Sequence, residues 1–251
     1  MIKRAFAASV LVIGLFVVST AAQAAEIKVL ASTGIQAAVE ALKPQFEKAS
    51  GDTLKVDFST TATLRDRIAK GEAFDVAILT DEAIDALITS GVLTASTRAE
   101  LARVGMGVAY KKGAPKPDVK TAASFKQTLL NAKSVAFTGN GATRPLIDKM
   151  FDTMGITKEM TAKSNLTPPA QAPAAVAEGK SEIVISLVSE FVAEPGVQLA
   201  GMLPTEYQTY LGFAAAEGAK AGNASGAQAF ITFADGHAAD AVYKAKGMEA
   251  K

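Results

Sequence analysis

Short apolar runs alternate with helix-like patterns along most of this chain, and that alternation restricts the fold more than any other feature. Residues 27–31 form a buried apolar run, and residues 36–49 place Ala37, Val39 and Leu42 on one helical face. Strands separated by helices of this length form βαβ units, whose strands run parallel. The sequence therefore predicts an α/β protein with mostly parallel sheets flanked by helices.

The same alternation continues to the end of the chain. Pro44 lies inside the first helix and is expected to kink it or divide it in two. Further strands are expected at residues 53–59, 76–79, 104–110, 134–138, 182–187 and 210–216. Further helices are expected at residues 62–70, 81–90, 122–131, 143–154, 225–234 and 237–246, and prolines at 168, 169 and 173 are expected to interrupt whatever element precedes residues 174–178.

The first 24 residues have the three parts of a secretory signal peptide. Lys3 and Arg4 precede an apolar stretch over residues 5–18, and Ala22-Gln23-Ala24 supplies an A-x-A cleavage site. The stretch is shorter than the roughly 20 apolar residues of a spanning helix. We expect cleavage after Ala24 and a soluble periplasmic protein.

The composition of the remaining chain argues against several classes of function. Removing Lys3 and Arg4 leaves 24 basic and 25 acidic residues, so no electrostatic footprint for nucleic acid is expected. The chain has no cysteine and a single histidine, His237, which argues against a zinc site. His237 is predicted to cap a helix or lie on the surface, and neither a metal nor a cofactor is expected.

Clusters of hydroxyl residues and glycines follow three of the predicted strands, where each runs into a helix. Ligands of open α/β sheets bind at the carboxyl ends of strands, and free amides at helix N-termini attract anions. The alternative interpretation is ordinary helix capping, for which Ser and Thr are preferred. The candidate ligand-binding residues in these clusters are Ser32, Thr33, Gly34, Thr60, Thr61, Asn140 and Thr143.

Two of these clusters carry a family resemblance. Residues 29–35, V-L-A-S-T-G-I, and residues 58–64, F-S-T-T-A-T-L, resemble motifs of the periplasmic molybdate-binding protein family of ABC transporter substrate-binding proteins. The similarity extends over nearly the whole mature length and includes a terminal helix pair, with Met248 where the family usually has phenylalanine. The resemblance implies a two-lobed fold that closes by a hinge around a small anion and presents it to a membrane permease. We expect a monomer with lobe one at residues 25–105 plus 210–251 and lobe two at residues 106–209.

Several site positions depart from the pattern of that family. Gly34 replaces a serine and offers only an amide, Thr61 replaces a serine conservatively, and Thr143 falls near a backbone contact. The tyrosine that closes the family's site falls near Ser186 or Leu187, so that donor is lost. These departures weaken the expectation that molybdate is the ligand.

Two arginines suggest an organic carboxylate instead. Arg65 and Arg144 each lie just inside a helix that begins at a candidate loop, and they are expected to come from opposite lobes. Arginine makes paired hydrogen bonds with carboxylates, so closure could clamp a di- or tricarboxylate. The alternative is that both are solvated or salt-bridged surface residues.

A second class of function is an enzyme on the same scaffold. Some relatives of this family are aconitate isomerases, which shift a proton and a double bond within a tricarboxylate. Such a reaction needs an acid or base, and Glu190, a hydroxyl residue or a water would have to serve. Ser189 and Glu190 are nevertheless predicted to form an exposed helix start rather than part of a cleft. Asp81 and Glu82 open another helix and are interpreted as complementing its dipole.

Overall fold

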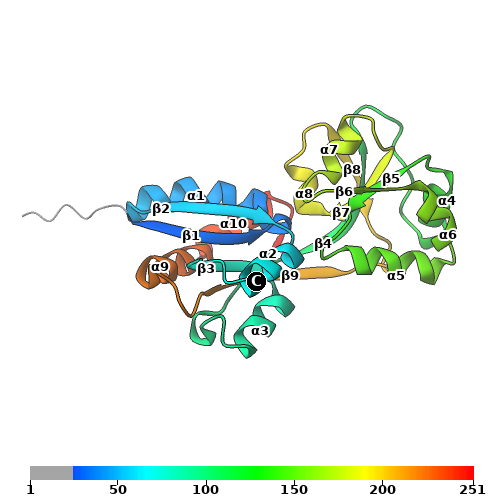
Figure 1. The fold of residues 1–251 in the computed structure, drawn as a ribbon. Coiled ribbons are helices and arrows are strands. Elements are labelled where there is room, and N and C mark those ends of the chain that lie inside the picture. Colours follow the sequence, from blue (N-terminus) through cyan, green and yellow to red (C-terminus); the bar gives the residue numbers. More distant parts are fainter. Residues whose placement is uncertain (1–24) are drawn as a thin grey trace, which may run out of the picture.

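The computed structural model describes residues 25–251, and its helices and strands form two groups joined by β4 and β9 (Figure 1). The signal peptide predicted for residues 1–24 lies outside the described residues. None of the helices in the described part of the chain has the length and apolar character needed to cross a membrane.

The strands belong to one continuous mixed sheet. Their order is β2-β1-β3-β9-β4-β7-β5-β6, and β8 and β10 pair with β4 beside this path. Their bounds are β1 (Glu26–Ser32), β2 (Thr53–Ser59), β3 (Val76–Thr80), β4 (Ala99–Lys111), β5 (Val135–Thr138), β6 (Ser164–Thr167), β7 (Ile183–Leu187), β8 (Val197–Met202), β9 (Tyr210–Glu217) and β10 (Glu249–Ala250).

Helices pack on both faces of the sheet. The 3₁₀ helices are η1 (Thr33–Ile35) and η2 (Ala95–Thr97). The α-helices are α1 (Gln36–Ser50), α2 (Thr61–Ala69), α3 (Asp81–Thr89), α4 (Ala122–Asn131), α5 (Arg144–Met154), α6 (Thr157–Lys163), α7 (Ala172–Ala177), α8 (Val188–Val192), α9 (Ala224–Ala234) and α10 (His237–Ala245).

The first half of the molecule comprises β1, β2, β3 and β9 with helices α1–α3, α9 and α10. Successive residues of a strand point to opposite faces, so Val29 packs in one core and Leu30 in another. The core around Val29 includes residues of α1, α9 and α10, where the Phe46 and Phe230 rings meet edge to face at 5.1 Å. The core around Leu30 includes Leu64 of α2 and residues of α3. The sheet is therefore covered by helices on both faces.

The second half comprises β5–β8 with helices α4–α8 and shows the same two layers. Phe137 of β5 packs with the core residues of α4, α5 and α6, whereas its neighbour Ala136 packs with α7 and with Phe191 of α8. The predicted α/β class with helices flanking the sheet is confirmed. Parallel pairs occur inside each half, and β4 and β9 make only antiparallel pairs, which gives the sheet its mixed character.

The two long strands β4 and β9 carry the chain between the halves. β4 pairs with β9 as far as Gly105, and from Met106 onward it pairs with β7. We therefore propose keeping the predicted lobe boundaries, which place residues 25–105 and 210–251 in one lobe and residues 106–209 in the other.

Most predicted elements are present in the structure, with two kinds of difference. Helix α1 runs undivided through Pro44, so the predicted division is wrong. The pattern also missed α6, β6, α7, β8 and β10. These elements are short, and β8 packs beside β4 with Leu199 and Met202 left partly exposed, so it lacks the continuous apolar run of a central strand.

Candidate ligand-binding site

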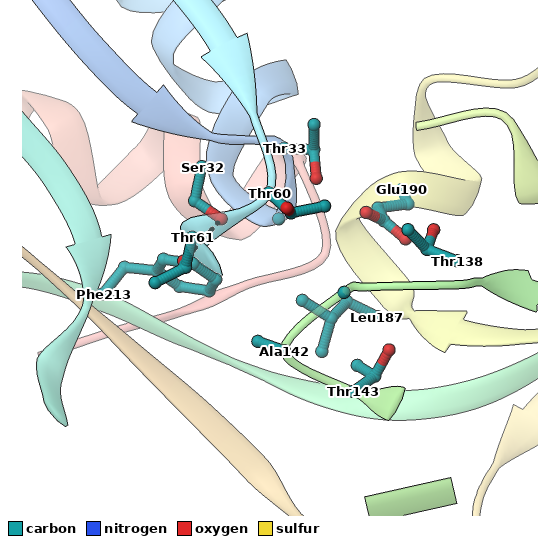
Figure 2. Close-up of a pocket in the computed structure, with 12 residues that line it drawn as sticks. Ser32, Thr33, Thr60, Thr61, Thr138, Ala142, Thr143, Leu187, Glu190 and Phe213 are labelled. Carbon is teal, nitrogen blue, oxygen red and sulfur yellow. Dashed lines mark hydrogen bonds between the residues drawn. The ribbon is translucent and has the colours of Figure 1, made fainter. Parts of the chain in front are cut away.

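The strand ends of the two halves face one another across a small polar pocket. β1 and β2 end in register at Ser32 and Ser59, while β5 and β7 end on the opposite side at Thr138 and Leu187. Figure 2 shows the side chains that converge there, and the cavity volume is about 20 Å³, which is room for one or two waters. The pocket is lined by Ser32, Thr33, Gly34, Thr60, Thr61, Thr138, Gly141, Ala142, Thr143, Leu187, Glu190 and Phe213.

Hydroxyl groups form the wall that the first half contributes. Ser32, Thr60 and Thr61 are all buried, and the Thr61 hydroxyl donates to the Ser32 hydroxyl at 3.3 Å. The parallel register of β1 and β2 brings these two residues together, because it aligns the ends of both strands. Buried hydroxyls that face a cavity can donate hydrogen bonds to an anion within it.

Helix capping accounts for only one of these hydroxyl groups. Thr60 caps α2 by accepting a hydrogen bond from the Thr63 amide at 3.2 Å. Ser32 precedes η1 and Thr143 precedes α5, and neither side chain accepts a capping hydrogen bond. The capping interpretation therefore leaves Ser32 and Thr143 unexplained, and both are almost completely buried against the pocket.

Two helix N-termini give the pocket a partial positive charge, although the described part of its wall contains no formal cation. No Lys, Arg or His is among its described lining residues. Helices α2 and α5 both begin at the pocket, and their N-terminal amides carry the partial positive charge of the helix dipole. The two helices come from opposite halves, so both halves contribute to the electrostatic attraction.

Glu190 brings the one carboxyl group into the pocket wall. It lies in the first turn of α8, and the Ser186 hydroxyl donates a hydrogen bond to its Oε2 atom. Burial raises the pKa of the Glu190 carboxyl above its ordinary value, although hydrogen bonds from Ser186 and Thr33 act in the opposite direction. Figure 2 shows the carboxyl group across the pocket from Thr33 and Thr60.

The prediction that Ser189 and Glu190 form an exposed helix start is wrong. Ser189 is only 2 % exposed and donates a hydrogen bond to the Gly34 carbonyl oxygen at 2.6 Å. The position of both residues directly after the buried strand β7 was the sequence signal that could have placed them at the ligand edge of the sheet.

Gly34 lies where any side chain would collide with both halves. A Cβ atom there would be 2.6 Å from Cζ of Phe213 and 2.7 Å from Cδ1 of Leu187. The absence of a side chain thus allows an aromatic ring and a leucine to close the apolar side of the pocket. Sequence reasoning missed Phe213 as a site residue because it comes from β9, which returns to the site from far along the chain.

A larger cleft adjoins the pocket and shares the wall formed by Thr61, Gly141 and Ala142. Its volume is about 830 Å³, and both Arg65 and Arg144 line it, together with the acidic residues Asp81 and Glu82. We call the smaller cavity the inner pocket and the larger one the outer cleft. The structure thus brings the two predicted arginines to one cleft from opposite halves, but outside the inner pocket.

The two arginines have different surroundings. The Arg144 guanidinium donates from Nε to Asp148 at 2.7 Å and lies 5.3 Å from the centre of the Phe137 ring. Arg65 is exposed, and no carboxylate of residues 25–251 lies within 4 Å of its guanidinium. Arg65 is therefore the more available of the two for a ligand.

The remaining predicted residues have structural contacts of their own. Asn140 lines the outer cleft, and its Nδ2 donates to the Thr63 hydroxyl at 3.1 Å, which links the two halves directly. Ser186 contacts the inner pocket only through Glu190. His237 begins α10 with a fully exposed side chain beside Asp240.

Comparisons with known proteins agree with this architecture. Residues 27–249 match the family model described as bacterial extracellular solute-binding protein. The chain is 30% identical over 212 residues to an aconitate isomerase of Pseudomonas sp, which covers 82% of this chain and 80% of the relative.

Two solved structures with low sequence identity share the fold. The periplasmic molybdate-binding protein of Azotobacter vinelandii superimposes with a TM-score of 0.75 at 18% identity, covering 90% of this chain and 99% of that one. A sulfate-binding protein of Mycobacterium tuberculosis superimposes with a TM-score of 0.71 at 16% identity, covering 90% of this chain and 87% of that one.

Proposed function

Because this chain belongs to the bacterial extracellular solute-binding protein family, we propose that it captures a small anion between its two halves for an ABC transporter. The observation that carries the proposal is the inner pocket, in which buried hydroxyls and two helix N-termini converge from opposite halves. The signal peptide predicted for residues 1–24 supports a periplasmic location.

The outer cleft favours an organic carboxylate over a simple oxyanion. An anionic group in the inner pocket would lie beside the shared wall of Thr61, Gly141 and Ala142. A second carboxylate on the same ligand would then extend into the outer cleft toward Arg65 and Arg144, which offer planar guanidinium donors. We propose that the ligand is a di- or tricarboxylate.

A thermal-shift screen of the purified protein tests the proposal. The ligands are sulfate, molybdate, phosphate, succinate and trans-aconitate, each at several concentrations. A ligand that binds only the folded state raises the melting temperature increasingly with concentration. We expect the largest shift with trans-aconitate. Stabilisation by molybdate or sulfate alone would retain the transport function but contradict the carboxylate assignment, and no shift with any anion would overturn the proposal.

Glu190 supports a second candidate function, the isomerisation of an unsaturated tricarboxylate. A partly buried carboxyl with a raised pKa is suited to taking and returning a proton, and the aconitate isomerase relative shares 30% identity with this chain. In this candidate reaction the Glu190 carboxylate takes a proton from the methylene carbon of aconitate. The electron pair of that C–H bond delocalises over the allylic carbons, the double bond shifts, and Glu190 returns the proton to the former vinyl carbon.

Proton NMR in D₂O separates catalysis from binding. Conversion of trans-aconitate to cis-aconitate is the expected result for an isomerase. Deuterium enters the new methylene group to the extent that the proton on Glu190 exchanges with solvent before its return. Glu190→Gln should abolish conversion, whereas the matched control Glu159→Gln changes an exposed glutamate on α6 and should not. If the wild-type protein binds aconitate but does not convert it, the isomerase function is excluded and transport remains the one candidate.

A further inference from the structure

The charge inside the inner pocket does not favour an anion as simply as its hydroxyls suggest. Glu190 is the one acidic residue among the described lining residues of the pocket, and no basic side chain lines the same wall. A ligand carboxylate or oxyanion would therefore face an ionised Glu190 with no cation between them. Two unpaired charges of the same sign repel strongly at a site removed from solvent.

The elements packed most extensively against α8 place no positive charge in the pocket wall. Lys246, next to the Gly247 that lies close to Val188 of α8, does not line the inner pocket either. Of the elements packed against it, η1, β7 and β8 carry no charged residue. None of the charged residues of α1 and β4 lines the inner pocket. These residues are Glu40, Lys43, Glu47 and Lys48 on α1, and Glu100, Arg103 and Lys111 on β4. The nearest arginines line the outer cleft, beyond the wall that both cavities share.

We propose that the bound complex holds one proton between Glu190 and the anion, and that Glu190 thereby determines which anions the site accepts. This inference rests on the proposed function, because it requires an anion in the inner pocket. The proton either resides on Glu190, which then donates a hydrogen bond to the ligand, or arrives with the ligand, and Glu190 then accepts one.

The local contacts of Glu190 fit this role. The Ser186 hydroxyl holds Oε2 in place, and the short helix α8 directs the carboxyl group toward the hydroxyls of the other half (Figure 2). Burial also favours the neutral form of the acid. A buried carboxylic acid that stays neutral can donate a hydrogen bond to an oxyanion, and it needs no cation to do so.

The shared proton predicts a selectivity that changes with pH. Sulfate carries no titratable proton near neutral pH, so it binds only when Glu190 is protonated. Its affinity should fall about tenfold for each pH unit above the pKa of Glu190. Hydrogen phosphate brings its own proton and can donate to the ionised carboxylate. The affinity for phosphate relative to the affinity for sulfate should therefore increase as the pH rises.

Calorimetric titration of the full protein tests the inference with three probes, sulfate, phosphate and trans-aconitate, between about pH 5 and about pH 8. Repeating each titration in two buffers of different ionisation enthalpy gives the number of protons taken up. We expect the number of protons taken up with sulfate to increase with pH and to approach one above the pKa of Glu190. Glu190→Gln keeps a neutral donor at the same position, so its sulfate affinity should be independent of pH. Glu159→Gln should behave like the wild-type protein.

The possible outcomes separate the inference from the function on which it rests. Binding of sulfate with no proton uptake and no pH dependence would overturn the shared proton and leave anion capture intact. Equal pH dependence in the wild-type and Glu190→Gln proteins would assign the proton to another group and overturn the role of Glu190. Failure of all three probes to bind at every pH would overturn anion capture itself, and the shared proton with it.

Discussion

The inner pocket and the outer cleft share a wall but present opposite chemistry to a ligand. The inner pocket, about 20 Å³, offers hydroxyls, helix amides and a carboxyl group. The outer cleft, about 830 Å³, offers the guanidinium groups of Arg65 and Arg144 beside open solvent, and the carboxyl groups of Asp81 and Glu82 also line it. Both cavities draw residues from both halves of the molecule.

This contrast suggests a division of tasks within one binding site. Neutral donors in a small buried cavity discriminate between ligands by their shape and protonation state. A ligand that fails to accept one of these hydrogen bonds leaves a buried polar group unpaired, which costs free energy. Exposed guanidinium groups are screened by solvent and contribute less energy, but they extend recognition to longer ligands. The predictions below separate the two contributions, from the largest expected effect to the smallest.

Gly34→Ala should disable the inner pocket. Its new Cβ atom would lie within 2.7 Å of both Phe213 and Leu187, so it must push these side chains into the cavity or hold the halves apart. Overpacking of up to about 3 kcal/mol corresponds to about a hundredfold loss of affinity. Calorimetry with the best ligand of the thermal screen measures this loss.

Gly139→Ala is the matched control for that substitution. Its Cβ atom would meet its nearest neighbour, Leu166, at an ordinary 3.6 Å. Its affinity should stay within about twofold of the wild-type value. Wild-type affinity in the Gly34→Ala protein would show that the ligand does not use the inner pocket.

Thr61→Val and Arg65→Gln should separate the two cavities. Valine preserves the shape of Thr61 but removes the hydroxyl that lies 3.3 Å from Ser32, so affinity for every bound probe should fall about tenfold. Arg65→Gln should weaken trans-aconitate about fivefold and sulfate less than twofold, because only the longer ligand reaches the outer cleft. Equal losses for both ligands in the arginine variant would contradict the division of tasks.

The free energy of unfolding of the ligand-free protein should depend on the protonation state of Glu190. Its pKa is raised in the folded state, so the folded protein binds more protons than the unfolded chain. The contribution of Glu190 to the free energy of unfolding is fully present below its pKa in the unfolded chain, about 4.3. It is lost as the pH rises through the pKa of Glu190 in the folded protein. The loss is at most about 1.4 kcal/mol per pH unit for one proton.

Urea denaturation of wild-type and Glu190→Gln proteins across that pH range measures the effect. The free energy of unfolding of the wild-type protein should fall relative to that of the variant as the pH increases. Parallel pH profiles would show that burial does not perturb Glu190, and that the carboxyl is ionised as freely as an exposed one.

Asn140→Ala should have the smallest effect. It removes the 3.1 Å hydrogen bond to Thr63, which joins the halves at the outer cleft, where solvent competes. Affinity should fall about twofold to threefold, since an exposed hydrogen bond contributes about 0.5 kcal/mol. Calorimetry with trans-aconitate measures it, and a loss as large as that of Thr61→Val would make the outer cleft the dominant site.

The sequence predicted the strand-end clusters because their pattern is local. Ser32, Thr60 and Thr143 each follow an apolar run and precede a helix, and strand ends converge in any sheet of this class. Their convergence on one pocket therefore required only the correct order of elements. The same local reasoning placed Arg65 and Arg144 near the site.

The parts of the site that sequence reasoning missed depend on tertiary packing. Phe213 reaches the pocket because β9 returns between β3 and β4, a pairing that no local pattern encodes. Glu190 was assigned to an exposed surface because an acidic residue in a first helical turn is usually solvated. Its partial burial depends on contacts with the other half, such as the hydrogen bond from neighbouring Ser189 to Gly34. Which cavity each arginine lines likewise depends on how the halves meet.

β4 has a mechanical consequence for the whole molecule. It is one unbroken strand, hydrogen-bonded to β9 and β10 in the first half and to β7 and β8 in the second. Rotation of one half against the other must therefore twist β4 between Gly105 and Met106, where its partners change. A strand that is hydrogen-bonded at both ends resists twisting. It therefore favours the return of the two halves to their original orientation, unlike a flexible loop that acts as a free hinge. Met202 and Gln208 already lie close to the backbone at Gly105. The volume of the side chains around Gly105 would then determine how strongly β4 resists twisting, and hence the free energy needed to open the molecule.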